Sequence, residues 1–206
     1  MMPPGPVAQP PVAGLVLAAG SGSRFGRPKA LVDYRGRPLV LRAVEVLIAA
    51  GCAPVLTVLG AAAAEVRVAV DLPGSVVNAD WASGMASSLR CGLAALPASA
   101  PAVVITLADQ PLVGSAAVVR LVLAWQAGAV AAVATYAGRP RNPVLLIRDV
   151  WPDVAAASAG ETGARAWLRA HPHLVTEVPC DGTGFPYDID TPDDLLALEA
   201  DHAARP

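Results

Sequence analysis

The segment LAAGSGSRFGRPKAL, residues 17–31, combines residue types that could hold a phosphate chain. Gly20 and Gly22 let the backbone approach a ligand closely, and successive N–H groups in such a loop form an anion-binding concavity. Arg24, Arg27 and Lys29 add positive charge in the same short segment. The sequence therefore predicts a polyphosphate site here. A flexible glycine turn with solvated arginines is the alternative.

This loop fits neither of two familiar phosphate-binding patterns. The dinucleotide fingerprint GxGxxG would need a third glycine where Phe25 stands. The P-loop would need glycine before its lysine and Ser or Thr after it, whereas Pro28 and Ala30 flank Lys29. The residues alone therefore do not identify the phosphate-bearing ligand.

Carboxylates follow two other segments in a way that suggests a metal site. Asp109 comes directly after the apolar run 102–108, where an unpaired carboxylate would be costly. Mg²⁺ prefers one or two carboxylates together with phosphate oxygens and water, so Asp109 is a candidate ligand. It could instead cap the turn before the helix expected from Gly114. In an extended chain, Asp188 and Asp190 point to the same side, and either could be the second ligand.

The elements that must position these residues alternate along the chain. Apolar runs predict buried strands at 12–19, 54–60, 75–79, 102–109, 129–137, 144–147 and 175–180. Helical spacing predicts helices at 38–51, 61–70, 84–96, 114–128 and 163–170, and one beginning near 193. The alternation indicates a single three-layer α/β/α domain over 12–206 with a mostly parallel sheet. Residues 1–11 are expected to be a flexible extension, and ligands should bind at the carboxyl ends of the strands.

Composition excludes several classes of protein. The net charge is −2, and no basic stripe is present for nucleic acid. No apolar segment is long enough to cross a membrane. Cys52, Cys91 and Cys180 are widely separated and odd in number, which argues against a disulfide framework or a zinc site. We therefore expect a cytoplasmic protein that binds neither nucleic acid nor membrane.

The glycine-rich segment resembles the signature of the MobA-like nucleotidyltransferases, roughly LAAGxSxRFGxxK. This resemblance implies a Rossmann-like sheet of the nucleotide-diphospho-sugar transferase type. It also implies that Arg24 and Lys29 act on the triphosphate in catalysis and that Asp109, in LADQP, binds Mg²⁺ with Asp190 or Asp188. The nucleotide-binding residues it implies in this segment are Leu17, Ala18, Ala19, Gly20, Gly22, Arg24 and Lys29.

Later segments resemble the molybdenum-cofactor cytidylyltransferases. NADWASGMASSL, residues 78–89, matches a stretch that lies by the nucleotide in that subgroup, which implies that Asn78, Gly84 and Ser88 bind nucleotide. Free N–H groups and hydroxyls at the start of this helix could read polar ligand edges, whereas Met85, Leu89 and Leu93 are expected in the core. RPRNPVLL and GETGAR imply an acceptor site at Arg141, Asn142, Gly163 and Arg165.

The resemblance implies a reaction in which CTP and molybdenum-molybdopterin give the cytosine dinucleotide cofactor and pyrophosphate. The alternatives are GTP, or another phosphorylated acceptor such as a sugar phosphate, phospholactate or a terpenoid precursor. An NAD(P)-binding oxidoreductase is disfavoured by the failed GxGxxG pattern, and a non-catalytic binding domain by the presence of Lys29 and Asp109. A transient contact with a molybdenum hydroxylase or its chaperone would pass the product on.

Overall fold

A seven-stranded sheet forms the centre of the computed structural model, which describes residues 11–203. Its strand order is β5-β4-β1-β6-β8-β7-β9, and only β8 runs antiparallel to its neighbours. This confirms the mostly parallel sheet. All but the last residue of the extension expected at 1–11 lies outside the described residues. The strands are β1 (Ala13–Ala18), β4 (Val55–Leu59), β5 (Ser75–Val77), β6 (Ala102–Leu107), β7 (Ala131–Tyr136), β8 (Arg139–Ile147) and β9 (Val175–Pro179).

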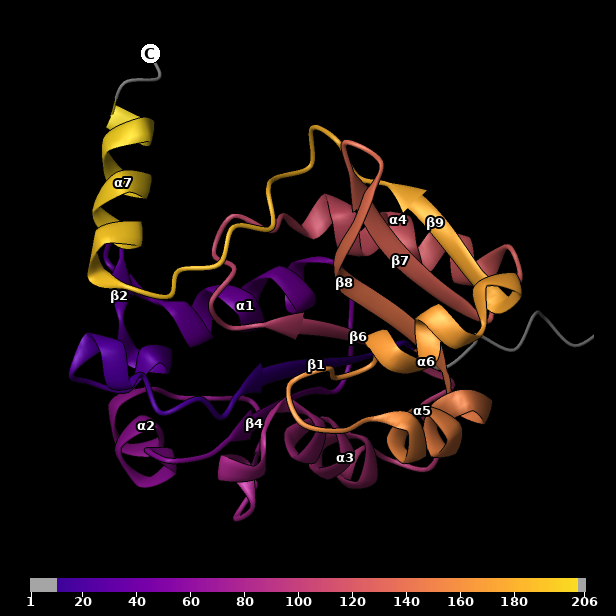
Figure 1. Ribbon diagram of the computed structural model, residues 1–206, viewed down its shortest axis with the longest axis horizontal. Coiled ribbons are helices and arrows are strands. Elements are labelled where there is room, and N and C mark those ends of the chain that lie inside the picture. The colour runs from indigo at the N-terminus through magenta and orange to yellow at the C-terminus, as the bar shows by residue number, and fades with distance from the viewer. Residues whose placement is uncertain (1–10, 204–206) are drawn as a thin grey trace, which may run out of the picture.

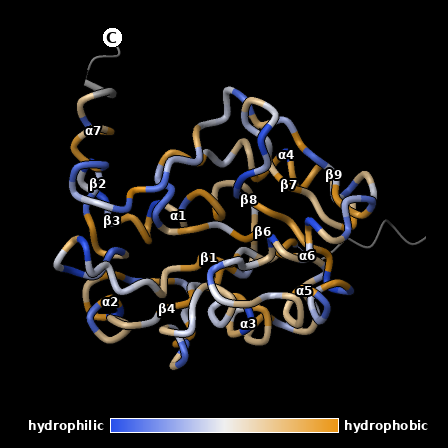
Figure 2. Tube along the Cα trace, in the orientation of Figure 1, coloured by the Kyte–Doolittle hydropathy of each residue, from blue (hydrophilic) through white to orange (hydrophobic). Residues whose placement is uncertain are grey.

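Helices cover both faces of this sheet, and strand β1 shows why (Figure 1). Its side chains alternate. Leu15 belongs to the core cluster that includes residues of α3, α5 and α6, whereas Val16 belongs to the cluster with residues of α1 and α4 on the other face. Such a strand is apolar throughout because both of its faces are buried. Figure 2 shows the same pattern, with hydrophobic strands and more hydrophilic loops. These helices are α1 (Leu39–Ala49), α3 (Met85–Ala95), α4 (Ser115–Gln126), α5 (Trp151–Ala157) and α6 (Arg165–Ala170).

Strand β8 begins five residues earlier than the predicted strand 144–147. Ala137 and Gly138, with φ of 49° and 70°, form a tight turn that joins β7 to β8, as expected for a two-residue hairpin loop. From Arg139 to Arg141 the strand pairs only with β7, and its pairing with β6 ends at Val144 opposite Ile105. The start of β8 therefore extends past β6 on the side of the carboxyl end of β6.

One α-helix and two short strands were not predicted. Helix α5 was missed, as was a small hairpin of β2 (Asp33–Tyr34) and β3 (Arg37–Pro38). Helix α2 (Ala63–Ala69) packs at one edge of the sheet, and α7 (Pro192–Ala203) stands apart from the sheet beside the hairpin (Figure 1). None of the helices within 11–203 has the length and apolar character to cross a membrane.

The segment that leads into α7 returns to the end of β6. The Ile189 N–H donates to the Asp109 carbonyl at 2.9 Å, and Ile189 itself is fully buried. The predicted helix start is confirmed, because the Asp194 N–H donates to the Thr191 hydroxyl and the Asp194 carboxylate accepts from the Thr191 and Asp190 N–H groups. These contacts fix Asp190 next to Asp109, although 81 residues separate them.

Candidate active site

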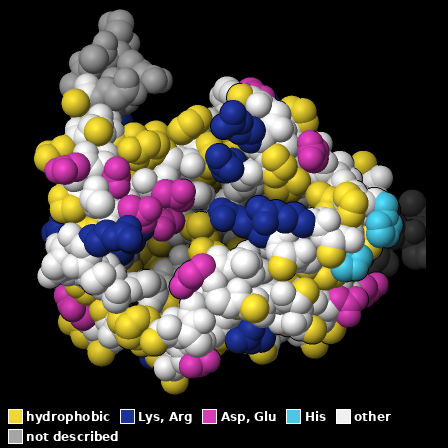
Figure 3. All heavy atoms as spheres, in the orientation of Figure 1, with side chains coloured by type: hydrophobic (Ala, Val, Ile, Leu, Met, Phe, Trp, Pro, Cys, Tyr) yellow, Lys and Arg dark blue, Asp and Glu magenta, His cyan; other side chains and the backbone are white. Residues whose placement is uncertain are grey.

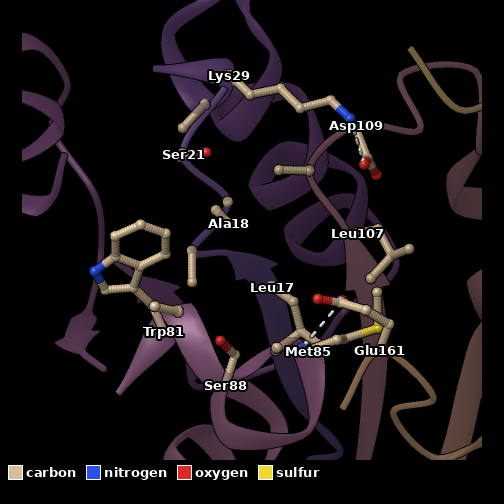
Figure 4. Close-up of a pocket in the computed structure, with 16 residues that line it drawn as sticks. Leu17, Ala18, Ser21, Lys29, Trp81, Met85, Ser88, Leu107, Asp109 and Glu161 are labelled. Atoms are coloured by element: carbon tan, nitrogen blue, oxygen red, sulfur yellow. Dashed lines mark hydrogen bonds and ion pairs between the residues drawn. The ribbon is translucent and has the colours of Figure 1, made fainter. Parts of the chain in front are cut away.

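A cavity of about 330 Å³ opens at the carboxyl ends of β1 and β6. It lies where ligands bind in open α/β sheets, next to the loop that follows β1. Figure 4 shows Lys29 and Asp109 at one end of the cavity, Trp81 on one side, and Met85 and Glu161 opposite. The predicted residues that line it are Leu17, Ala18, Ala19, Gly20, Lys29, Gly84, Ser88 and Asp109.

Lys29 joins two of the predicted carboxylates at this end of the cavity. Its Nζ lies 2.8 Å from Asp109 Oδ2 and 2.7 Å from Asp190 Oδ1. Asp188, the other candidate ligand, instead accepts a hydrogen bond from the Gln110 amide at 2.8 Å. The structure thus brings Asp190 to Lys29 and Asp109, and it places Asp188 one hydrogen bond further out.

The protonation of this ion pair reflects its partial burial. Burial raises the pKa of the Asp109 carboxyl above its ordinary value, and Lys29 acts in the opposite direction. Burial lowers the pKa of the Lys29 ammonium, but Asp109 and Asp190 together outweigh burial and leave that pKa above its usual range. Since the ammonium is 2.8 Å from the carboxylate, we take both groups as charged near neutral pH.

One carboxylate oxygen of Asp109 has no hydrogen-bond partner within residues 11–203. Its Oδ1 is buried and has no hydrogen-bond partner among the described residues. An unpaired buried carboxylate oxygen is costly, and a cation would satisfy it. No group of three or more His, Cys, Asp or Glu side chains within 11–203 could hold a metal by itself. A metal here would therefore need further ligands from a bound phosphate or from water.

The glycine-rich loop positions Lys29 through close backbone packing. Gly22 has φ of 64°, and a Cβ on it would collide with the Arg27 carbonyl and the Lys29 nitrogen. Its role in the structure is therefore to let the loop fold back on itself, and it does not line the cavity. Arg24 is exposed and also lies outside the cavity lining. The structure does not bring Arg24 to the site.

The start of helix α3 corrects one expectation. Free N–H groups were expected there, but the Met85 N–H donates to the Glu161 carboxylate at 3.2 Å and the Ala86 N–H to the Gly160 carbonyl at 2.9 Å. The loop before α6 therefore caps α3, because the helix has no cap of its own. Gly84 is needed for this docking, since a Cβ there would lie 2.6 Å from the Gly160 oxygen.

The Ser88 hydroxyl remains available to a ligand. Buried Asn78 lies outside the cavity lining and donates to the Ser87 and Ser88 hydroxyls at 2.7 and 3.0 Å. Ser88 lines the cavity, and because its oxygen accepts from Asn78, its own hydrogen can point to a ligand acceptor. Asn78 is thus a supporting residue rather than a lining one.

A second, much smaller cavity of about 30 Å³ lies on the other side of Met85. Three of the four predicted acceptor residues line it, Asn142, Gly163 and Arg165, whereas exposed Arg141 does not. Met85 lines both cavities, so its expected place in the core is only partly correct. Figure 3 shows basic side chains on both sides of an acidic group on this face of the molecule.

Several residues that line the larger cavity were not predicted as site residues. Trp81 and Glu161 lie within quoted motifs, but nothing in their spacing indicated a wall of a cavity. Ser21, Ala30, Ala82, Met85, Leu107 and Ala108 complete the set. The predicted Lys29, which lies among them, is the only lysine of the chain, and the other basic residues among the fifteen lysines and arginines are all arginines.

The chain is similar to a family model and to several known proteins. The model of the MobA-like NTP transferase domain matches residues 14–175. The chain is 38% identical to nicotine blue oxidoreductase of Paenarthrobacter nicotinovorans, over 92% of this chain and 97% of that protein. It is 32% identical to molybdenum cofactor guanylyltransferase of Rhodobacter capsulatus, over 91% and 95% of the two chains.

A solved structure agrees over nearly the whole chain. Rv0371c of Mycobacterium tuberculosis H37Rv is 32% identical, with a TM-score of 0.82 over 93% of this chain and 98% of that one. A second structure of Rv0371c, in complex with manganese, has a TM-score of 0.78. The sheet, the site at its carboxyl edge and these matches lead to one conclusion: the chain belongs to the family of MobA-like NTP transferase domains.

Proposed function

We propose that this protein transfers CMP from CTP to the terminal phosphate of molybdenum-molybdopterin, giving molybdopterin cytosine dinucleotide and pyrophosphate. The observation that carries the proposal is the Lys29–Asp109 pair at the head of a 330 Å³ cavity bordered by a glycine-rich loop. This arrangement combines an ammonium, backbone N–H groups and a carboxylate, which a metal-bound triphosphate requires. The family membership supports nucleotidyl transfer as the reaction class.

Magnesium fits the carboxylates of this site. The partnerless Oδ1 of Asp109 and the half-exposed Asp190 would hold the ion, with phosphate oxygens and water as the other ligands. When bound, the ion would neutralise negative charge on the triphosphate. A manganese complex of a 32% identical structural relative supports the use of a divalent ion.

The reaction needs charge neutralisation more than a base. A phosphate monoester has a second pKa of about 6, so the acceptor is already mostly dianionic near neutral pH. An acceptor oxygen forms a bond to the α-phosphorus, and the bond from that phosphorus to the bridging oxygen breaks, so that both electrons leave with pyrophosphate. No histidine lines the cavity within the described part of the chain. Lys29 would stabilise the charge on the transferring and departing phosphates.

The acceptor would approach from the side of Met85. The small cavity lined by Asn142, Gly163 and Arg165 adjoins the nucleotide cavity and offers one guanidinium for the acceptor phosphate. We prefer CTP because of the form of the glycine-rich segment, whereas the relative from Rhodobacter capsulatus is a guanylyltransferase, which keeps GTP as an alternative. Another small phosphorylated acceptor would fit the same chemistry.

A second candidate function is oxidation–reduction with a nicotinamide dinucleotide. The observation in its favour is the 38% identity to a protein named an oxidoreductase. The same cavity could accept the pyrophosphate of a dinucleotide at Lys29. Among the described residues no cysteine lines the cavity, so no protein thiol could donate electrons there. The electrons would come from the bound nicotinamide.

One set of assays separates these functions. Pyrophosphate release is measured with each of the four ribonucleoside triphosphates and Mg²⁺, with and without molybdenum-loaded molybdopterin. We expect release only with the acceptor, and most with CTP. If pyrophosphate were released with GTP and with no other triphosphate, the nucleotide substrate would be GTP rather than CTP. Oxidation of NADH or NADPH without any pyrophosphate release would replace the proposal with the second candidate.

A further inference from the structure

The ammonium of Lys29 occupies a position that a divalent cation would also favour. It lies within 2.8 Å of Asp109 and 2.7 Å of Asp190, the two carboxylates that fit the metal best. The two ion pairs differ in exposure, because the side chain of Asp109 is 26% exposed and that of Asp190 is 52% exposed. The lysine therefore connects a partly buried carboxylate to one that solvent can reach.

The local balance of charge explains why a cation is held here. Asp188 and Asp190 both raise the pKa of Asp109, so the carboxylates repel one another, and Lys29 is the cation that contacts Asp109 and Asp190 among the described residues. Gln110 gives Asp188 only a neutral N–H group. Removing Lys29 without replacement would leave these negative charges close together at the edge of the sheet.

The choice of lysine at this position also matters. Lys29 is the single lysine in a chain whose other basic residues are arginines. An ammonium is a compact charge on a flexible stem, whereas a guanidinium forms a planar fork that grips a carboxylate with two bonds. Lys29 lines the cavity together with Ser21 and Ala30, and its ammonium contacts the two carboxylates.

We propose that Lys29 is an exchangeable counter-cation. It neutralises Asp109 and Asp190 in the empty protein and yields them to the metal when a triphosphate provides its ammonium with a new anionic partner. This inference rests on the proposed use of a metal and a triphosphate. Its consequence is that metal alone binds weakly, because it competes with Lys29, and that metal and triphosphate bind cooperatively.

The first test measures Mn²⁺ binding without any nucleotide, from the electron paramagnetic resonance signal of free Mn²⁺. We expect Lys29→Met to bind Mn²⁺ about tenfold more tightly than the unmodified protein, since the competitor is gone. Arg27→Met removes the same charge from an exposed neighbour and should change the affinity by less than about twofold. Equal or weaker Mn²⁺ binding by Lys29→Met would overturn the proposal.

A double variant shows where any gain arises. Lys29→Met combined with Asp109→Asn should lose the tighter Mn²⁺ binding, because the gain is assigned to the released carboxylates. Retention of the gain in the double variant would contradict the proposal, since the metal would then bind elsewhere. Circular dichroism of each variant establishes that the binding data refer to folded protein.

The second test uses the unmodified protein and its unique lysine. In protein labelled with ¹⁵N-lysine, one side-chain ammonium signal reports on Lys29 alone. We expect Mg²⁺ and a non-hydrolysable CTP analogue together to shift it at concentrations where Mg²⁺ alone does not. An unchanged signal with both, or the same shift with Mg²⁺ alone, would overturn the proposal.

Failure of this inference and failure of the proposed function are distinguishable. A protein that releases no pyrophosphate, but whose Lys29→Met variant binds Mn²⁺ more tightly, would reject the transferase proposal and keep the exchange at Lys29. A protein that transfers CMP, but whose Lys29→Met variant shows no gain in Mn²⁺ affinity, would reject the exchange alone.

Discussion

The cavity that we propose for the nucleotide and the smaller one that we propose for the acceptor share Met85 as a lining residue but differ in how far they are formed. They are called the nucleotide half and the acceptor half of the proposed site below. The nucleotide cavity has about 330 Å³ of space, and its charged groups are held by ion pairs at 2.7 and 2.8 Å. The acceptor cavity has about 30 Å³, and no hydrogen bond or ion pair of the Arg165 side chain is found within the described residues. The nucleotide half thus has room for a ligand, whereas the acceptor half is nearly closed.

The difference follows from the elements that build each half. The nucleotide cavity is set by the ends of two central parallel strands, β1 and β6, which are buried on both faces. The acceptor cavity is lined in part by Thr162, Gly163 and Ala164 of the loop before α6, which Glu161 and Gly160 attach to the start of α3. A loop attached to the start of a helix by two hydrogen bonds can move at lower cost than a central strand. We therefore expect the loop before α6 to move and enlarge the acceptor cavity when the acceptor binds.

The largest expected effect is a loss of turnover in a variant of the nucleotide half. Asp109→Asn removes the charge that would hold the metal and should lower metal-dependent turnover at least about a thousandfold. Steady-state pyrophosphate release measures the loss, and circular dichroism should show an intact fold. Asp71→Asn, at an exposed aspartate away from the site, is the matched control and should keep its activity. Near-normal turnover of Asp109→Asn would remove Asp109 from its assigned role.

The next effect is on stability in the same half. Lys29→Met should lower the free energy of unfolding by about 1–3 kcal/mol at pH 7, between the values for exposed and buried ion pairs. Burial raises the folded pKa of Asp109 above 3.8 and Lys29 opposes this, so the variant has a still higher pKa. The deficit should therefore shrink as the pH falls from the pKa of Asp109 in the variant to its lower pKa in the unmodified protein, below which the carboxyl is neutral in both proteins.

Urea unfolding at several pH values between 4 and 8 measures this dependence. A deficit that stays constant over the whole range would show that the ammonium contributes through packing rather than through charge. That result would weaken the view that the nucleotide half is organised by its ion pairs.

A moderate effect is expected in the acceptor half. Gly163 has φ of 50°, and a Cβ on it would lie 3.0 Å from the sulfur of Met85. Gly163→Ala should raise the KM for the acceptor about three- to tenfold, equivalent to about 1 kcal/mol, and change the KM for CTP less, because Met85 also lines the larger cavity. Gly138→Ala has similar backbone strain, with φ of 70° and open space around it, and is the matched control. Equal changes in both KM values would mean that the two halves do not act separately.

The smallest expected effect is at a residue outside both halves. Cys91 is half-buried on α3, and burial raises the pKa of its thiol, which keeps it a weak nucleophile. Cys91→Ser should leave kcat and both KM values within about twofold, since the thiol touches neither cavity. A large loss of activity in this variant would reveal a thiol function that the comparison of the two halves ignores.

The sequence alone determined most of the fold, because buried parallel strands and amphipathic helices have distinct local patterns. The strand at 12–19 and the helices at 38–51 and 84–96 needed no information from distant residues. The hairpin before Val144 was missed, because its first residues RPRNP read as a loop and become a strand only by pairing with β7. Helix α5 was missed for a related reason, since it is short and its burial is set by α3 and α6.

The candidate site divides in the same way. Sequence determined the types of its charged residues, because a glycine-rich loop with a lysine and an aspartate after a buried strand carry their chemistry locally. Only the tertiary structure decided that Asp190 rather than Asp188 contacts Lys29, that Arg24 points to solvent, and that Glu161 caps α3. These outcomes depend on contacts between residues 76 to 161 positions apart, and no local pattern encodes which of two nearby carboxylates will reach a distant ammonium.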